Sequence, residues 1–196
     1  MSCAAFCRRE DKSKRPAGWG CKMETQALGF VLERSPRRQD HLEHSIAEVD
    51  KASHPSALSL IDAWEKLQPH GGMVMGRDFP SRRFAALLPN ILLLERLERV
   101  RDFRVRVAGF GMLCFYGFDP SGRRLGEIYE GEKHKVRCEA LGDVLCRHRP
   151  SLALSRLSHD GEMVLQREIV SLPVLAFDAR TPLVLVASFW NRRWLN

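Results

Sequence analysis

The residues of this chain best suited to chemistry are two histidines and a thiol that share one face of a predicted helix. They lie in the segment 132–148. Together with two leucines they are spaced four, three, four and three residues apart, which places all five on one side of a helix: His134, Cys138, Leu141, Leu145 and His148. Imidazole titrates near neutral pH and is a common metal ligand. His134 lies between Lys133 and Lys135 at the start of the segment, so we expect a partly exposed histidine and not a cofactor ligand.

A second polar grouping, between 155 and 160, does not predict a catalytic set. Ser155, Ser158, His159 and Asp160 are close in sequence, but a hydrolytic triad requires a positioned nucleophile. Asp160 followed by Gly161 is typical of a tight hairpin turn. We predict no catalytic residue, and therefore a protein that is not an enzyme.

Two glycines follow a predicted strand and precede a predicted helix. The pattern of Gly109 and Gly111 lacks the third glycine of a dinucleotide-binding fingerprint, because Cys114 stands at that position. The alternative role is mechanical: glycines let the chain leave a sheet sharply and bring a helix close to it.

The cysteines indicate neither disulfides nor a metal centre. There are six, and they are scattered: Cys3, Cys7, Cys21, Cys114, Cys138 and Cys146. The opening residues do not have the pattern of a secretory signal, so we expect a cytoplasmic location in which thiols stay reduced. Cys3 and Cys7 have a spacing that metal sites use, but a zinc site needs about four ligands held together. We predict no metal site.

Composition and charge exclude some classes of partner. The chain is 44% hydrophobic and 28% charged, and no apolar run approaches the roughly 18 residues that span a bilayer. Of the net charge of +7, residues 1–50 contribute +1 (nine Lys and Arg against eight Asp and Glu), which leaves +6 for residues 51–196. Those charges are dispersed and no nucleic-acid-binding motif accompanies them. We expect neither nucleic acid nor membrane as a partner.

The chain divides near residue 52. Residues 1–52 mix Gly, Pro, Ser and charge, which predicts a largely disordered arm with a short helix at 40–51. Leu42, Ile46 and Val49 would form a narrow apolar stripe on that helix. Because the stripe lacks an obvious partner within the chain, we expect it to mediate a homodimer.

Residues 53–196 have the length of one domain, and their periodicity predicts an α+β fold. A leading helix carries a broad apolar stripe that includes Trp64. Strands are predicted at 91–97 and 103–107, where Phe103, Val105 and Val107 alternate with arginines. The helix at 132–148 then precedes three further strands, at 153–158, 163–177 and 183–190.

These segments carry motifs that resemble the PAS domain family, and more narrowly a PAS-like family widespread in alphaproteobacteria. The motifs are a Trp on a leading helix, Leu-Pro before the first strand, an Asp-Phe-Arg-x-Arg-x-x-Gly strand and a Gly-x-Asp-x-x-Gly-Arg turn. They correspond here to Trp64, Leu88 with Pro89, Asp102 to Gly109, and Gly117 to Arg123, with a weaker likeness at Glu168 and at Leu172 with Pro173. The resemblance implies a five-stranded antiparallel sheet with helices packed on one face, preceded by N-terminal helices.

In a PAS fold the concave face of the sheet and the longest helix enclose a cavity. The resemblance therefore implies candidate ligand-binding residues: Phe103, Val105, Val107, Phe110, Phe115, Tyr116, His134 and Cys138. Some PAS domains bind haem through a histidine on the equivalent helix, which would be His134, but nothing else marks a haem pocket. The cysteine motif of light-sensing PAS domains is absent as well. No particular cofactor is predicted.

The function implied by the resemblance is that of a non-catalytic, cytoplasmic sensor or interaction module in bacterial signal transduction. Such a module binds a small molecule, a signalling partner protein, or both. The alternative is an interaction adaptor that holds no ligand, and a small-molecule enzyme is the least favoured class.

Overall fold

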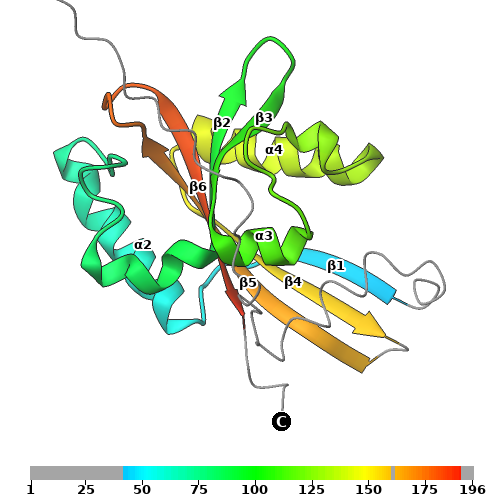
Figure 1. The fold of residues 1–196 in the computed structure, drawn as a ribbon. Coiled ribbons are helices and arrows are strands. Elements are labelled where there is room, and N and C mark those ends of the chain that lie inside the picture. Colours follow the sequence, from blue (N-terminus) through cyan, green and yellow to red (C-terminus); the bar gives the residue numbers. More distant parts are fainter. Residues whose placement is uncertain (1–41, 160–161, 191–196) are drawn as a thin grey trace, which may run out of the picture.

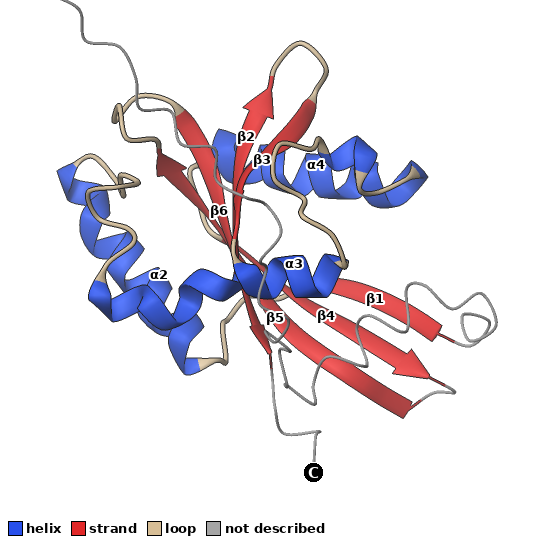
Figure 2. Cartoon of the chain, in the orientation of Figure 1, coloured by secondary structure: helices blue, strands red, loops and turns tan. Residues whose placement is uncertain are grey.

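The structure, a computed structural model, describes residues 42–159 and 162–190 and is built on one antiparallel sheet (Figures 1 and 2). Its strands stand in the order β1-β4-β5-β6-β2-β3. The strand bounds are Leu42–Glu48 (β1), Ile91–Leu97 (β2), Asp102–Ala108 (β3), Ser151–His159 (β4), Glu162–Leu175 (β5) and Pro182–Trp190 (β6). The predicted α+β class is confirmed, with six strands in place of five. Most of the predicted arm, residues 1–41, lies outside the described residues.

The additional strand is β1, and the helix predicted at 40–51 is wrong. β1 pairs antiparallel with β4, from Leu42 opposite His159 to Glu48 opposite Ala153. An isolated helix of about twelve residues is marginal in water, whereas the edge of β4 supplies a ready ladder of hydrogen bonds. The helical stripe that predicted a homodimer is therefore not formed, and the Ile46 side chain is 45% exposed on the strand.

Helix α2 (Pro55–Leu67) covers one face of the sheet with the stripe that the sequence predicts. The ring of His54 caps its first turn by accepting a hydrogen bond from the Ser56 N–H at 3.1 Å. Trp64 is 5% exposed, and its indole N–H donates to the carbonyl oxygen of Pro173 at 2.7 Å. Trp64 is thus core, held by one hydrogen bond to β5.

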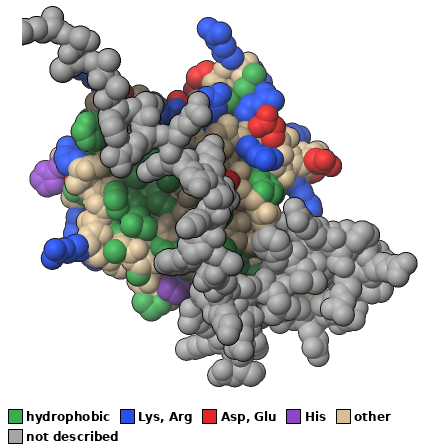
Figure 3. Space-filling model, in the orientation of Figure 1, with side chains coloured by type: hydrophobic (Ala, Val, Ile, Leu, Met, Phe, Trp, Pro, Cys, Tyr) green, Lys and Arg blue, Asp and Glu red, His purple; other side chains and the backbone are tan. Residues whose placement is uncertain are grey.

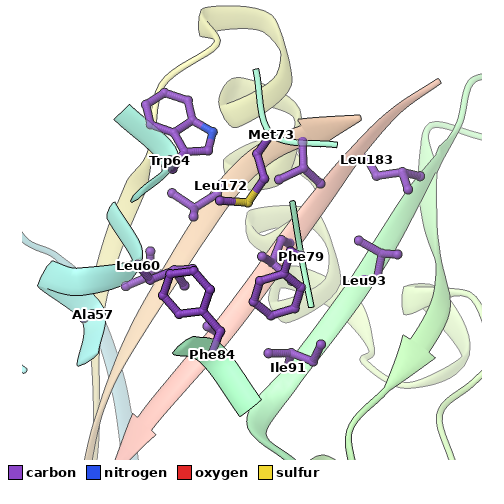
Figure 4. Packing of buried hydrophobic residues seen from close by; sticks show 14 of the residues in the cluster. Ala57, Leu60, Trp64, Met73, Phe79, Phe84, Ile91, Leu93, Leu172 and Leu183 are labelled. Carbon is purple, nitrogen blue, oxygen red and sulfur yellow. The ribbon is translucent and has the colours of Figure 1, made fainter. Parts of the chain in front are cut away.

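The same face is completed by the 3-10 segment η3 (Arg82–Asn90), whereas the short 3-10 segment η2 (Gln68–His70) follows α2 and contains no buried residue. Figure 4 shows Phe84 of η3, together with Met73 and Phe79 from the preceding loop, packing with Leu60 of α2 over the strands. The buried members of this first cluster are Ala57, Leu60, Trp64, Met73, Phe79, Phe84, Ile91, Leu93, Val170, Leu172, Val174, Leu183, Leu185, Ala187 and Phe189.

A buried carboxylate fastens the start of this layer to the sheet. Glu168 on β5 is 5% exposed, and its Oε2 accepts the Ser53 N–H at 2.9 Å and the Ser53 hydroxyl at 2.7 Å. The His54 N–H donates to the same oxygen at 3.2 Å. The residues that lead into α2 are therefore held directly on β5.

The opposite face is covered by helix α3 (Phe110–Tyr116), the 3-10 turn η4 (Leu125–Glu127) and the long helix α4 (Gly131–Arg147). Helices thus pack on both faces, which corrects the predicted one-sided arrangement. The reason is the strand pattern: odd and even positions of β2 and β6 are both apolar, so each face requires a cover. The second cluster consists of Leu92, Leu94, Phe103, Val105, Met112, Leu125, Leu141, Val144, Leu145 and Val184.

Two glycines allow α3 to lie close to η3. A Cβ on Gly109 would lie 2.0 Å from the carbonyl oxygen of Leu88. A Cβ on Gly111 would lie 2.3 Å from Oδ1 of Asn90. Neither position has room for a side chain, so the glycines do have a mechanical role, but the element that α3 approaches through them is η3 and not the sheet.

Charges of both signs are mixed on the surface around the hairpin of β2 and β3 (Figure 3). Ion pairs there join Arg96 to Glu98 at 3.3 Å and Arg106 to Glu95 at 3.1 Å.

Among residues 42–159 and 162–190, no helix combines the length and the apolar character needed to cross a bilayer.

Candidate functional site

Most of the candidate residues from the sequence fall on the face of the sheet that α4 covers. Phe103 and Val105 on β3 are buried in the second cluster, 2% and 0% exposed. Phe115 and Tyr116 at the end of α3 pack against this cluster, and so does Cys138 on α4. The structure therefore brings these five side chains to one region.

Val107 and Phe110, in contrast, do not belong to this region. Val107 is 48% exposed and Phe110 is 62% exposed. In the β2–β3 ladder Leu93 pairs with Val107 and Leu94 pairs with Val105, so Arg106 is an extra residue on β3. Such a bulge turns the following residues to the other face of the sheet. The predicted alternation fails at Val107 for this reason.

Asp102, His134 and Cys138 form a compact polar group between β3 and α4. Nε2 of His134 lies 3.0 Å from Oδ1 of Asp102, and Sγ of Cys138 lies 3.2 Å from the same nitrogen. Sγ of Cys138 is 3.5 Å from Oδ1 of Asp102. His134 and Cys138 are one helical turn apart, so α4 presents both to the first residue of β3.

Backbone groups hold the Asp102 carboxylate in place. Oδ1 accepts the Phe103 N–H at 2.7 Å, and Oδ2 accepts the Gly126 N–H at 3.3 Å. Burial by itself would raise the pKa of Asp102, but hydrogen bonds from His134, Phe103 and Gly126 outweigh it, and the pKa is lowered. A Cβ on Gly126 would lie 3.2 Å from Oδ2 of Asp102, so the glycine leaves room for this approach.

The thiol of Cys138 is not prepared for nucleophilic attack. Burial, together with the negative charge of Asp102 and a hydrogen bond to it, raises the Cys138 pKa to about 11. Since the thiolate is the reactive form, the group is a neutral thiol at neutral pH. In a nucleophile–imidazole–carboxylate relay the nucleophile and the carboxylate contact opposite ring nitrogens. Here Cys138 and Asp102 contact the same nitrogen of His134.

A tyrosine pair joins α3 to the segment before α4. The hydroxyls of Tyr116 and Tyr129 are hydrogen-bonded, with their oxygens 2.5 Å apart. Burial raises the pKa of Tyr116 well above its ordinary value, and the neighbouring Tyr129 adds to this effect. The guanidinium of Arg137 lies over the Tyr129 ring, 3.8 Å from its centroid. The guanidinium of Arg167, from β5, lies 4.2 Å from the Phe115 ring centroid.

Sequence reasoning found His134, Cys138 and Tyr116 as candidates. It missed Asp102 as the neighbour of the first two and Tyr129 as the partner of Tyr116. Asp102 precedes His134 by 32 residues, and only the packing of α4 on β3 brings the two together. A signal for Tyr129 was available, because the chain has two tyrosines in all, and both belong to the pair.

Comparison with protein families decides how this arrangement is classified. A family model described as a PAS domain matches residues 52–187, which is more than half of the chain. The chain belongs to the PAS domain family. The comparisons with curated proteins and with solved structures each return no match.

Helix α4 is the longest helix among the described residues. It covers the face of the sheet that carries the second cluster, and the Asp102 group joins α4 to β3 on that face. Strand β1 precedes the matched residues and adds a sixth strand at the β4 edge.

Proposed function

We propose that this PAS domain is a non-catalytic sensor or interaction module in bacterial signal transduction, and that it acts in the cytoplasm. The family match over residues 52–187 carries the proposal, because PAS domains serve as sensory or interaction modules. Residues 53–196 constitute the sensory unit in this proposal. The mixed signs of charge around the β2–β3 hairpin favour a protein or small-molecule partner over nucleic acid.

The place we assign to a ligand is the edge of the second cluster, at the hydroxyls of Tyr116 and Tyr129. A small-molecule site combines apolar walls with a few convergent polar groups. Phe115 and Tyr116 supply apolar surface there, and the paired hydroxyls supply the polar groups. Arg137 lies on the Tyr129 ring and adds positive charge beside them. A neutral or anionic aromatic molecule fits this combination best.

The alternative is an adaptor in which the chain's own side chains fill the space beneath α4. The observation that favours it is the second cluster itself, whose ten buried residues pack directly between the sheet and α4. An adaptor of this kind would signal through a partner protein alone.

Native mass spectrometry of the full chain, as purified, tests the proposal. We expect a bound mass that is released on denaturation, and a smaller retained fraction in Tyr129→Phe. Val107→Ala is the matched control, because this side chain is exposed and the bulge at Arg106 turns it to the other face of the sheet from Val105. A chain without bound mass that co-purifies with a stable partner protein supports the adaptor. If neither a bound molecule nor a partner is found, the proposed function is wrong.

A further inference from the structure

We propose that Asp102, His134 and Cys138 form a binding site for a divalent transition metal ion, with Zn²⁺ as the ion that the donors suit best. The inference does not depend on the proposed sensory function. It rests on three potential ligand atoms that approach one another from two elements: Oδ1 of Asp102, Nε2 of His134 and Sγ of Cys138.

The separations of these atoms suit a common ion. They are 3.0 Å between the oxygen and the nitrogen, 3.2 Å between the nitrogen and the sulfur, and 3.5 Å between the oxygen and the sulfur. A point about 1 Å out of the plane of the three atoms is about 2.1 Å from each, close to the bond lengths of zinc to oxygen, nitrogen and sulfur. Shifts of a few tenths of an ångström would complete the geometry.

The donor types point to the same class of ion. One thiolate, one imidazole and one carboxylate form a mixed set that suits borderline-soft ions such as Zn²⁺ and not the hard ions Mg²⁺ and Ca²⁺. Binding of the ion would displace the proton of the Cys138 thiol to solvent, and the resulting thiolate and the Asp102 carboxylate would balance the charge of the ion. Three protein ligands leave a fourth position for water or another small ligand.

The surroundings provide support and access. N–H groups of Phe103 and Gly126 hold the carboxylate of Asp102, as outer groups do around established metal ligands. The Asp102 side chain is 8% exposed, whereas that of His134 is 30% exposed, which leaves a route from solvent. A bound ion would fix the first turns of α4 on β3.

The probe for this site is Co²⁺, because a Co²⁺–thiolate bond gives a charge-transfer absorption in the near ultraviolet. The full chain should develop this band at one ion per chain, and Cys138→Ser should remove it. The matched control changes the other five cysteines to serine (Cys3, Cys7, Cys21, Cys114 and Cys146) and should keep the band, since Cys138 is then the sole thiol. Absence of the band in the native chain, or its persistence in Cys138→Ser, overturns the proposal.

A second measurement covers the case in which Cys138→Ser does not fold. Zn²⁺ at about a hundredfold excess over Kd should raise the Tm of the native chain by about 5 °C or more. His134→Gln, with its fold checked by circular dichroism, should lower the affinity for Zn²⁺ at least about tenfold. An unchanged affinity in this variant, or a loss of binding in the five-serine control, assigns the ion to other residues and refutes the site.

Discussion

Replacement of Glu168 measures how strongly the α2 layer depends on one buried carboxylate. Its Oε2 accepts two hydrogen bonds from Ser53 and one from the backbone of His54, and the residue is 5% exposed. A hydrogen bond to a charged group contributes about 1.5–3 kcal/mol, and the exposed Ser53 can donate to water once the carboxylate is removed. Because these terms are not additive, we expect Glu168→Ala to lower the free energy of unfolding by about 3 kcal/mol.

The expected shift in Tm follows from the size of the chain. For a domain of 150–250 residues, 1 kcal/mol corresponds to about 2–4 °C, so Glu168→Ala should lower Tm by about 6–12 °C. Ser53→Ala removes only the hydroxyl donor and should cost about 1 kcal/mol. The double variant should then cost less than the sum of the two, because Ser53 and Glu168 share one hydrogen bond.

Hydrogen exchange locates the effect. In Glu168→Ala the amides of α2 should exchange faster than in the native chain, because opening of this layer requires less free energy. The amides of α4, on the opposite face, serve as the internal reference. A loss below about 0.5 kcal/mol, which is typical of an unimportant surface position, would refute the anchoring role of Glu168.

The remaining predictions each pair a variant with a control or a condition. Val105→Ala should lower the free energy of unfolding by about 2–3 kcal/mol in chemical denaturation, whereas Val107→Ala should change it by no more than about 0.5 kcal/mol, because only Val105 is buried. Equal losses in the two variants would contradict the bulge at Arg106. Gly109→Ala should prevent stable folding, because the added Cβ would collide with the carbonyl oxygen of Leu88. Gly142→Ala is the control: its Cβ would have no atom within 4 Å, and alanine should raise the free energy of unfolding by up to about 1 kcal/mol because it favours the helix α4. The Thr181 hydroxyl and the amides of Thr181 and Arg180 lower the Asp178 pKa from 3.8 to about 2, so Asp178 stabilises the β5–β6 turn above pH 4 and loses this contribution as the pH falls towards 2. The difference in Tm between the native chain and Asp178→Asn should shrink over that range, and a constant difference would show that the carboxylate charge is not responsible.

The outcome for β1 shows where sequence periodicity misled. The spacing of Leu42, Ile46 and Val49 fits one face of a helix, and the residues of β4 that would compete for this segment lie more than a hundred positions away. Whether a short segment pairs with a distant edge depends on the edge being free, which local sequence does not encode. The helix prediction failed for this reason, and so did the dimer interface based on it.

The sequence by itself determined the elements with strong local signals. The apolar stripe around Trp64, the strands at 91–97 and 183–190, and the helix that ends before Pro150 all formed as predicted. The apolar stripe of each helix buries one face, and the continuous apolar runs of these strands bury both faces, wherever the partner lies. The motifs from Leu88 to Arg123 also sufficed to place the chain in its family.

Tertiary structure alone decided the candidate site. The bulge at Arg106 turned Val107 away from the second cluster, and the alternating sequence of β3 does not predict a bulge at this position. Asp102 met His134 and Cys138 because α4 packs across the start of β3, and Tyr116 met Tyr129 because α3 ends beside η4. These contacts join residues on different elements, so their positions are set by how the sheet twists and how the helices pack on it, and not by spacing along the chain.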